Sequence, residues 1–374
     1  TNNNGLIQIN NDIFTEEERE YLRVNRFWVD DNEDEIALLE REINHNIQKR
    51  QKELELTIAL TNYCNFSCVY CYQNKNEKLM TTEVANMIIE KIDRILNDNI
   101  FEGINIHYFG GEPLLNIPVL IYLDENIKKI TDKIGIVYKA FLTTNGSMLS
   151  KELLQKVKFS SIQLTFDGLE KTHDRLRVSD HFHFKEEIEL IENIMNFSQA
   201  KVLLRTNICK ENKDEIIALH KYIFEKFGNE RIEINPNRTI KYHQDDSFEM
   251  LSVQEYAEVA YQIKLLWSEQ KGKFELPVPR STPCKFPYGN AYAISPEGYC
   301  TFCSGSMDQE KKYFFDVDIE NKKMFSVRKE CKKCNILPLC LGGCIIQYNL
   351  RAGACTYEKY ELKNILISYI KHIS

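Results

Sequence analysis

The chain has 374 residues, 43% of them hydrophobic, and a formal net charge of −7 at pH 7. This length and apolar content suffice for about two to three domains with a substantial core. The acidic balance argues against an enzyme that grips nucleic-acid phosphates along a basic track. No apolar run is long enough to cross a bilayer and the first residues are polar, so we expect a cytoplasmic protein with no membrane partner.

The 12 Cys residues are unevenly placed. Three lie near position 68, Cys209 stands alone, and eight fall between Cys284 and Cys355. In a chain with this much apolar content, clustered Cys pairs indicate metal sites in a reducing compartment rather than disulfides. The isolated Cys209 is typical of a buried thiol.

Residues 1–54 form a separate charged segment, which we expect either to pack as a short hairpin and helix or to contact a peptide substrate. From 55 to 250, apolar runs typical of strands alternate with amphipathic helical runs, which predicts a parallel sheet. Strands are expected at Glu55 to Thr61, Ile104 to Phe109, Ile136 to Thr143, Ser161 to Phe166, Val202 to Asn207 and Arg231 to Asn235. Six such units fit an α/β fold, a partial (β/α)6 TIM-like barrel whose reaction face lies at the carboxyl ends of the strands.

Three further units follow the predicted barrel. Residues 251–283 contain a linking helix and a bridge in which three prolines mark the entry to a new unit. Residues 284–360 form a cysteine-rich domain. Residues 361–374 are expected to form a terminal helix that docks back on the protein.

Cys64, Cys68 and Cys71 have the spacing C-x3-C-x2-C directly after the first predicted strand. Three closely spaced thiolates can hold three corners of a cubane [4Fe–4S] cluster and leave one iron free for a small ligand. A zinc knuckle is disfavoured, because zinc takes four ligands and no His lies nearby. The arrangement resembles the radical S-adenosylmethionine (SAM) superfamily, in which the amino and carboxylate groups of SAM chelate the free iron.

The ends of the next strands carry motifs that resemble the SAM site of the same superfamily. Gly110-Gly111-Glu112 resembles the element that receives the SAM amino group, and Tyr70 fits a residue that lines the adenine site. The resemblance implies a SAM site formed by Tyr70, Gly110, Gly111, Glu112, Asn145, Thr165, Asp167 and Arg205. Each motif alone also suits a tight turn, so the ordered set carries the interpretation. His173-Asp174 with Arg175 and Arg177 follows the fourth strand, and the sequence does not choose between substrate binding and loop anchoring for it.

The C-terminal cysteine array resembles a SPASM domain, the auxiliary-cluster module of radical SAM enzymes that modify peptides. A zinc ribbon would need two C-x2-C knuckles about 15 to 20 residues apart, whereas the cysteines after Cys334 in this chain have spacings of x5 and x3. The resemblance implies an outer cluster held by Cys331, Cys334, Cys340 and Cys355, and an inner cluster held by Cys284, Cys303 and Cys344. The sequence leaves the role of Cys300 undecided. In a strand, Cys300 would face away from Cys303 and would not bind the cluster, whereas in a turn it could be the fourth ligand of the inner cluster.

The resemblance covers about residues 55 to 360 and implies a radical SAM/SPASM peptide maturase, of the thioether-forming type that acts on ribosomally made peptides. It implies three [4Fe–4S] clusters, SAM, a precursor peptide, and a low-potential electron donor such as flavodoxin or ferredoxin. Reductive cleavage of SAM would give a 5′-deoxyadenosyl radical that abstracts hydrogen from the peptide, so that a Cys thioether closes. No catalytic side chain is assigned, and no nucleic-acid partner is expected.

Three alternatives remain. Sulfatase-maturating enzymes form formylglycine and carry an acidic residue directly after the second SPASM cysteine, where this chain has Ser304. A maturase that makes a carbon–carbon link is a second alternative. A non-enzymatic Fe–S electron carrier would explain the cysteines but not the ordered motifs at the strand ends.

Overall fold

The computed structural model describes residues 15–17, 19–20, 33–73, 76–228, 231–241, 247–272, 277–301, 303–306, 312–317, 324–344 and 355–373. Much of the predicted N-terminal hairpin therefore lies outside the described residues. Within them a nine-stranded sheet has the order β6-β5-β4-β3-β2-β1-β7-β8-β9. The strands are β1 (Glu53–Ala59), β2 (Gly103–Phe109), β3 (Val137–Thr143), β4 (Phe159–Thr165), β5 (Lys201–Ile208), β6 (Ile232–Arg238), β7 (Asn290–Ile294), β8 (Tyr299–Thr301) and β9 (Lys312–Tyr313).

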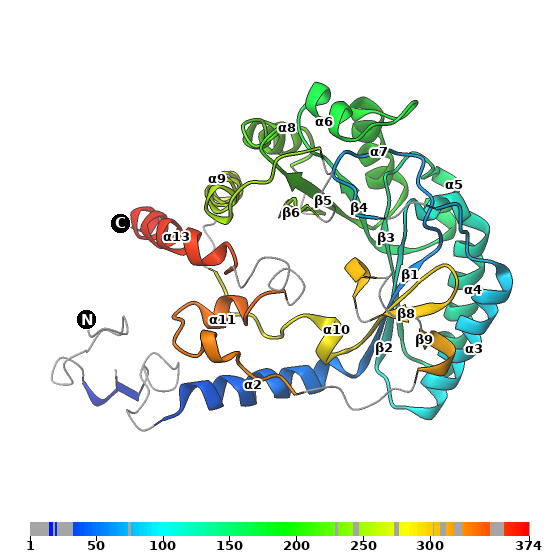
Figure 1. The fold of residues 1–374 in the computed structure, drawn as a ribbon, viewed down its shortest axis with the longest axis horizontal. Coiled ribbons are helices and arrows are strands. Elements are labelled where there is room, and N and C mark those ends of the chain that lie inside the picture. The colour runs from blue at the N-terminus through cyan, green and yellow to red at the C-terminus, as the bar shows by residue number, and fades with distance from the viewer. Residues whose placement is uncertain are drawn as a thin grey trace.

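Strands β1 to β6 coincide with the six predicted strands to within a few residues and pair in parallel. Helices follow them in the expected alternation, and Figure 1 shows the sheet curving with α3, α4, α5, α7 and α8 along its outer side. The helices of this part are α3 (Thr82–Asp98), α4 (Ile117–Ile134), α5 (Lys151–Lys156), α6 (Glu170–Leu176), α7 (Phe184–Phe197) and α8 (Ile216–Phe227), with a 3-10 turn η2 (Pro113–Asn116). The predicted partial barrel is confirmed.

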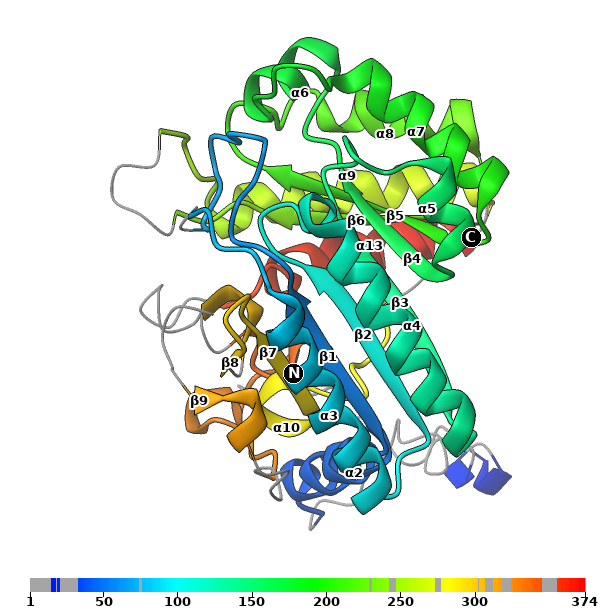
Figure 2. The same cartoon turned by 90° about the vertical axis from the view of Figure 1, so that its right-hand side faces the viewer.

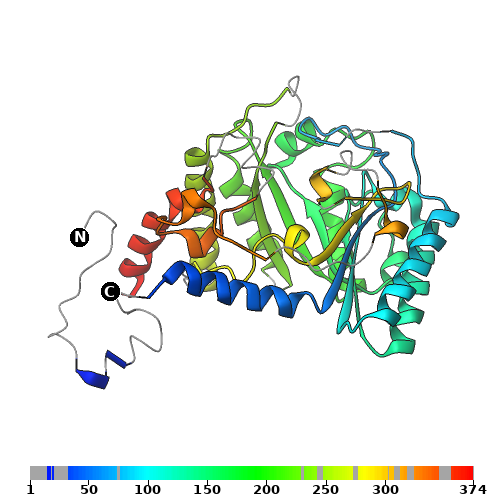
Figure 3. The same ribbon diagram turned by 60° about the horizontal axis from the view of Figure 1, so that its bottom comes forward.

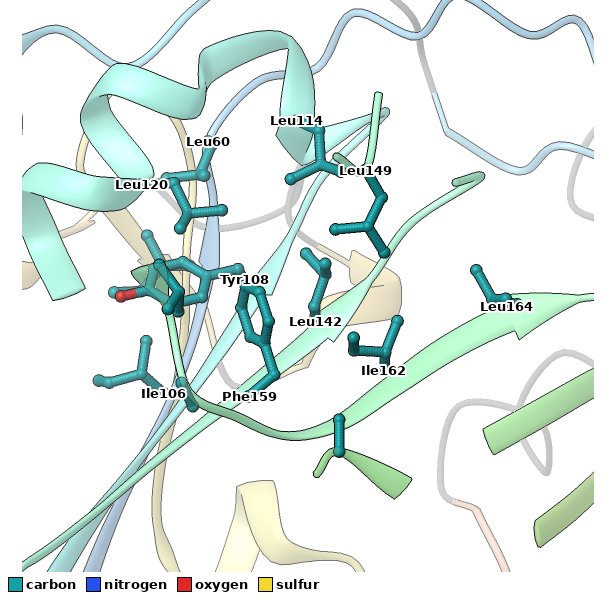
Figure 4. Close-up of a cluster of buried hydrophobic side chains, with 14 of the residues drawn as sticks. Leu60, Ile106, Tyr108, Leu114, Leu120, Leu142, Leu149, Phe159, Ile162 and Leu164 are labelled. Carbon is teal, nitrogen blue, oxygen red and sulfur yellow. The ribbon is translucent and has the colours of Figure 1, made fainter. Parts of the chain in front are cut away.

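The main core lies between the sheet and the outer helices. Successive strand residues point to opposite faces, and Leu54, Leu56 and Ile58 of β1 are all buried on the helix side. Figure 4 shows Tyr108 and Leu142 from β2 and β3 packed near Leu120 of α4. In the view of Figure 2, α3 and α4 lie across these strands.

The other face of the same strands is polar. The parallel register places Thr57 beside His107, Thr143 beside Gln163, and Thr165 beside Arg205, so their side chains share that face. Arg205 is in turn beside Asn235. The concave side of the partial barrel therefore offers hydrogen-bonding groups rather than an apolar core.

The cysteine-rich region is joined to the barrel more closely than its sequence boundaries suggest. Strand β7 pairs in parallel with β1, and β8 and β9 continue the sheet in antiparallel fashion. The remaining helices are α2 (Glu35–Arg50), α9 (Val253–Lys271), α10 (Lys285–Tyr288), α11 (Leu337–Cys340) and α13 (Glu358–Ile373), with short 3-10 turns η3 (Ser304–Ser306), η4 (Phe314–Asp316) and η5 (Lys329–Cys331). None of the described helices is long and apolar enough to span a membrane.

Helix α2 binds the C-terminal region rather than standing apart. Ile43 and Ile47 pack with Leu337 and Leu341, and Asn44 exchanges two hydrogen bonds with the backbone of Phe325 at 2.9 and 2.7 Å. Figure 3 shows α2 running along the base of the molecule beneath this region. The predicted linking helix is α9, and the predicted terminal helix is α13, which begins at Glu358 and packs against α9.

Candidate functional site

The cysteine motif lies in the long connection between β1 and α3, at the carboxyl end of the strands. Cys64, Cys68 and Cys71 are all half-buried. The backbone N–H of Ser67 donates to the carbonyl of Val178 at 2.8 Å, and that of Val69 donates to Leu176 at 3.0 Å. These two bonds place Cys68 opposite Arg177, so the motif that follows strand β4 forms one wall of the cysteine loop.

Gly110 and Gly111 hold the other side of the loop. A Cβ at Gly110 would lie 2.3 Å from the carbonyl oxygen of Thr61, and one at Gly111 would lie 2.2 Å from that of Tyr63. Gly110 also has a φ of +136°, which residues with a side chain rarely adopt. The expected close backbone approach is therefore present, and what approaches is the chain's own loop, just before Cys64.

Glu112 braces the carboxyl ends of β2 and β3. Its buried carboxylate accepts from the backbone N–H of Leu114 at 2.9 Å, the hydroxyl of Thr144 at 2.7 Å and the backbone N–H of Asn145 at 2.6 Å. Burial raises the pKa of this carboxyl group, while the hydrogen bonds from Asn145, Thr144 and Leu114 oppose the rise. Glu112 thus has two backbone partners and one side-chain partner, and its contact with SAM stays a prediction.

Asp167 links the cysteine loop to strands β4 and β5. Its carboxylate accepts from the Tyr70 hydroxyl and, at 2.7 Å, from the backbone N–H of Asn207. The side chain of Asn212 donates at 2.8 Å to the Asp167 carbonyl. Burial raises the pKa of Asp167, against the lowering effect of the Arg177 charge and the Tyr70 hydrogen bond.

The remaining predicted SAM contacts, Asn145, Thr165 and Arg205, lie on or just after strands β3, β4 and β5. The Asn145 amide donates to Asn65 at 2.8 Å and lies 3.9 Å from the Cys64 sulfur. Thr165 is the last residue of β4, beside Arg205 on β5, whose guanidinium donates to Asn207 at 2.8 Å. Of these three residues Asn145 lies beside the cysteine loop, and the binding of SAM by all three stays a prediction.

Three of the cysteine sulfurs accept hydrogen bonds from the backbone, as the thiolate ligands of iron–sulfur clusters do. Backbone N–H groups two residues further along the chain point at the sulfurs of Cys64 (3.4 Å), Cys303 (3.3 Å) and Cys340 (3.4 Å). Each predicted cluster contains one of these three cysteines, and hydrogen bonds to sulfur are one means of setting cluster potentials. Burial raises the pKa of the Cys68 thiol to about 11, partly offset by the Arg177 charge.

No three His, Cys, Asp or Glu side chains among the described residues converge on a single-ion site. A cubane cluster does not need ligands that converge on one point, since each thiolate binds a separate iron corner. The donor set after β1, three half-buried cysteines with no His in the motif, therefore fits a [4Fe–4S] cluster rather than one metal ion.

Two pairs of the C-terminal cysteines lie close enough for one sulfur to affect the pKa of the other. The nearby Cys344 adds to the rise that burial causes in the pKa of the Cys284 thiol. In the same way Cys334 adds to the raised pKa of Cys340. These neighbour relations are compatible with the inner and outer sets, while the complete ligand sets, with Cys303, Cys331 and Cys355, stay predictions.

Cys300 lies in strand β8 and is 5% exposed. It packs in the main hydrophobic core, whereas Cys303 follows the strand and is half-buried. Of the two readings of the sequence, this placement favours the one in which Cys300 is a bystander. Cys209 is fully buried, as expected of a structural thiol.

A second polar cluster lies near the amino end of β1. Glu55 pairs with Arg50 of α2 and with Lys285, the residue after Cys284, each at 2.9 Å. Burial acts to raise the pKa of Glu55, but the two cations outweigh it and hold the pKa below its ordinary value. The cluster borders a cavity of about 500 Å³ lined by Asn46, Lys49, Arg50, Glu53, Glu55, Asn105, Ser281 and Thr282.

Sequence reasoning missed Glu187, a buried carboxylate behind the cysteine loop. Glu187 of α7 is fully buried, 3.1 Å from the imidazole of His173, which is 2% exposed. The signal was present, because Glu187 falls on the apolar stripe formed by Phe184, Ile188 and Ile191. A charged residue on a buried helix face needs a partner, and Arg177 is the nearby cation.

Comparison with known families agrees with this geometry. Residues 58–223 match the radical SAM superfamily model. The matched segment contains the cysteine loop and strands β2 to β5, which is the part of the chain that carries the predicted SAM site.

Curated relatives align with this chain to different extents. The radical SAM cyclopropyl synthase TigE from Paramaledivibacter caminithermalis is 24% identical over 372 residues, which cover 87% of this chain and 76% of that protein. An uncharacterised protein from Methanocaldococcus jannaschii is 34% identical over 119 residues, and this alignment spans 31% of this chain and 39% of the relative's length.

Solved structures share the fold over most of the chain. The structure of anSMEcpe with bound AdoMet and Cp18Cys peptide has a TM-score of 0.67 at 18% identity, covering 86% of this chain and 98% of that one. Streptococcus suis SuiB bound to precursor peptide SuiA has a TM-score of 0.59 at 16% identity, covering 91% and 86%. These similarities confirm the α/β fold with its largely parallel sheet.

Proposed function

We propose that this chain is a radical SAM peptide maturase that installs a cross-link in a precursor peptide. The observation that carries the proposal is the three-cysteine loop seated on the carboxyl ends of the strands, above a concave face lined with polar side chains. The anSMEcpe and SuiB structures each contain a bound peptide, which supports a peptide substrate here. A low-potential electron donor such as flavodoxin or ferredoxin completes the proposal.

When bound at Cys64, Cys68 and Cys71, the [4Fe–4S] cluster would supply the electron that cleaves SAM and so generates the radical that abstracts hydrogen. The residues of the chain hold the cysteine loop and the peptide in position. Asp167 and Glu112 lock the strand ends around the loop, and the glycines at 110 and 111 leave no room between β2 and the loop. The polar concave face offers donors and acceptors that can hold a peptide backbone near the loop.

We further propose a Cys thioether as the cross-link. With Cys300 in the core, the inner auxiliary cluster of a SPASM domain would have three cysteine ligands, Cys284, Cys303 and Cys344, and one open iron corner. An open corner can bind the substrate thiolate and lower its pKa. Ser304 stands where formylglycine-forming enzymes carry an acid, and a serine hydroxyl is a poor base at neutral pH.

A carbon–carbon link is the second candidate product. It is favoured by the similarity to TigE, named as a cyclopropyl synthase, over 87% of this chain. Both products leave the peptide two hydrogens lighter, so mass alone does not separate them. Alkylation does, because a thioether consumes the Cys thiol, whereas a carbon–carbon link leaves it reactive.

The proposal is tested with the reconstituted, reduced protein and SAM. We expect 5′-deoxyadenosine from the native chain, and none from the variant with Cys64, Cys68 and Cys71 all changed to Ala, which should retain its auxiliary iron. SAM cleavage by the triple variant would overturn the cluster assignment. Mass spectrometry of Cys-containing precursor peptides then tests the product, and formylglycine formation without cross-linking would refute the maturase proposal.

A further inference from the structure

Arg177 is a buried cation beside the cysteine loop. Its residue is 6% exposed, and its guanidinium lies over the ring of Phe66 at 5.3 Å from the centroid. The backbone hydrogen bonds on either side of it, from Ser67 to Val178 and from Val69 to Leu176, place it directly across from Cys68. Arg177 and Cys68 therefore face each other in the way that paired residues on neighbouring strands do.

The charges around Arg177 are mostly negative. Glu112, Asp167 and Glu187 are each fully buried, and the groups whose charges act on the guanidinium include Cys68, Glu187 and Asp167. The Nε of Arg177 has no hydrogen-bond acceptor among the described residues, although it is buried. A side chain present only to pair with Glu187 would be expected to spend its donors on that carboxylate, so the unused donor indicates a further role.

We propose that Arg177 is a positioning residue that raises the reduction potential of the [4Fe–4S] cluster held by Cys64, Cys68 and Cys71. This inference rests on the cluster assignment in the proposed function. Reduction adds one electron from an external low-potential reductant to the bound cluster and breaks no bond in the chain. A fixed positive charge stabilises the more negative, reduced form, whereas the surrounding carboxylates disfavour it.

The test is a redox titration of the SAM-responsive cluster signal by electron paramagnetic resonance, on the full chain. Arg177→Gln should lower the reduced-to-oxidised ratio at a fixed solution potential at least tenfold, a shift of about 59 mV for one electron. Arg177→Lys keeps the charge and should retain most of the native potential. Arg175→Gln is the matched control, because it removes the same charge from an exposed side chain two residues away.

An Arg177→Gln potential equal to that of the Arg175→Gln control would overturn the inference. Loss of Arg177 also leaves Glu187 buried without its cation, which can unfold the protein. The double variant Arg177→Gln/Glu187→Gln, compared with Glu187→Gln alone, measures the same effect without that carboxylate, and equal potentials in this pair would equally refute it. A native chain without a SAM-responsive signal would refute the cluster assignment itself, so the two failures are distinguishable.

Discussion

Replacement of Gly110 by Ala tests how tightly strand β2 holds the cysteine loop. The new Cβ would lie 2.3 Å from the Thr61 carbonyl oxygen, and the residue would keep a φ of +136°. The backbone strain costs about 1–3 kcal/mol. Forcing the two backbones apart costs about 1–3 kcal/mol more. We therefore expect a loss of about 2–6 kcal/mol in the free energy of unfolding, a large part of the about 5–15 kcal/mol typical of a native protein.

Gly135→Ala is the matched control. Gly135 has a φ of +83°, but a Cβ there would meet nothing within 4 Å. Only the left-handed backbone cost of about 1–2 kcal/mol applies at that site. The difference between the two variants thus reports mainly the contact between Gly110 and the loop.

Urea unfolding followed by circular dichroism measures the two losses, and iron analysis after reconstitution reports the loop itself. Because the clash falls three residues before Cys64, Gly110→Ala should also lose about four iron per chain, while Gly135→Ala should keep its full iron content. Equal destabilisation of the two variants, with equal iron and equal SAM cleavage, would refute the proposed packing of β2 on the loop.

Three other changes have expected outcomes. Tyr70→Phe removes a hydroxyl donor from the buried Asp167 carboxylate and should weaken SAM binding about tenfold by calorimetry, with iron content unchanged. Burial lowers the pKa of His220 to about 4, whereas the imidazole of the unfolded chain takes up a proton below about pH 6.5. The free energy of unfolding should therefore fall by about 2 kcal/mol from pH 7 to pH 5. His220→Gln should flatten this pH dependence in urea titrations. Because Lys285 and Arg50 hold the pKa of Glu55 low, its contribution is present above the ordinary carboxyl pKa and lost in acid, so Glu55→Gln should destabilise the protein at pH 7 more than at pH 3 by thermal unfolding.

The barrel could be predicted from the sequence because its strands are apolar runs of ordinary length, separated by helices with clear apolar stripes. Strand β7 could not be predicted as part of the barrel sheet in the same way. Its five residues have no alternation to read, since all are buried, and its partner β1 lies more than 200 residues earlier. Pairing at such a separation is set by tertiary packing, not by a local pattern.

In the candidate site too, local patterns could be predicted from the sequence and long-range contacts could not. The cysteine spacing and the turn motifs are local, so the sequence identifies them. The contacts that fix the loop are not local: Gly110 meets Thr61, Tyr70 meets Asp167, and Ser67 meets Val178. Sequence reasoning therefore predicted which residues gather at the strand ends and missed which of them hold one another.

Strand β1 connects the two cysteine regions. Its carboxyl end leads into the loop of Cys64, and Glu55 near its amino end is paired with Lys285, next to Cys284. The parallel partner β7 runs to the same carboxyl end, and β8 then runs back and leads to Cys303. The predicted inner cluster is therefore tied to the same strand as the cysteine loop, so the distance between them is set by the sheet and not by a flexible linker. Under the proposed function, a peptide held on the concave face would meet the radical and the proposed open iron corner at a fixed separation, as closure of a thioether between two defined residues requires.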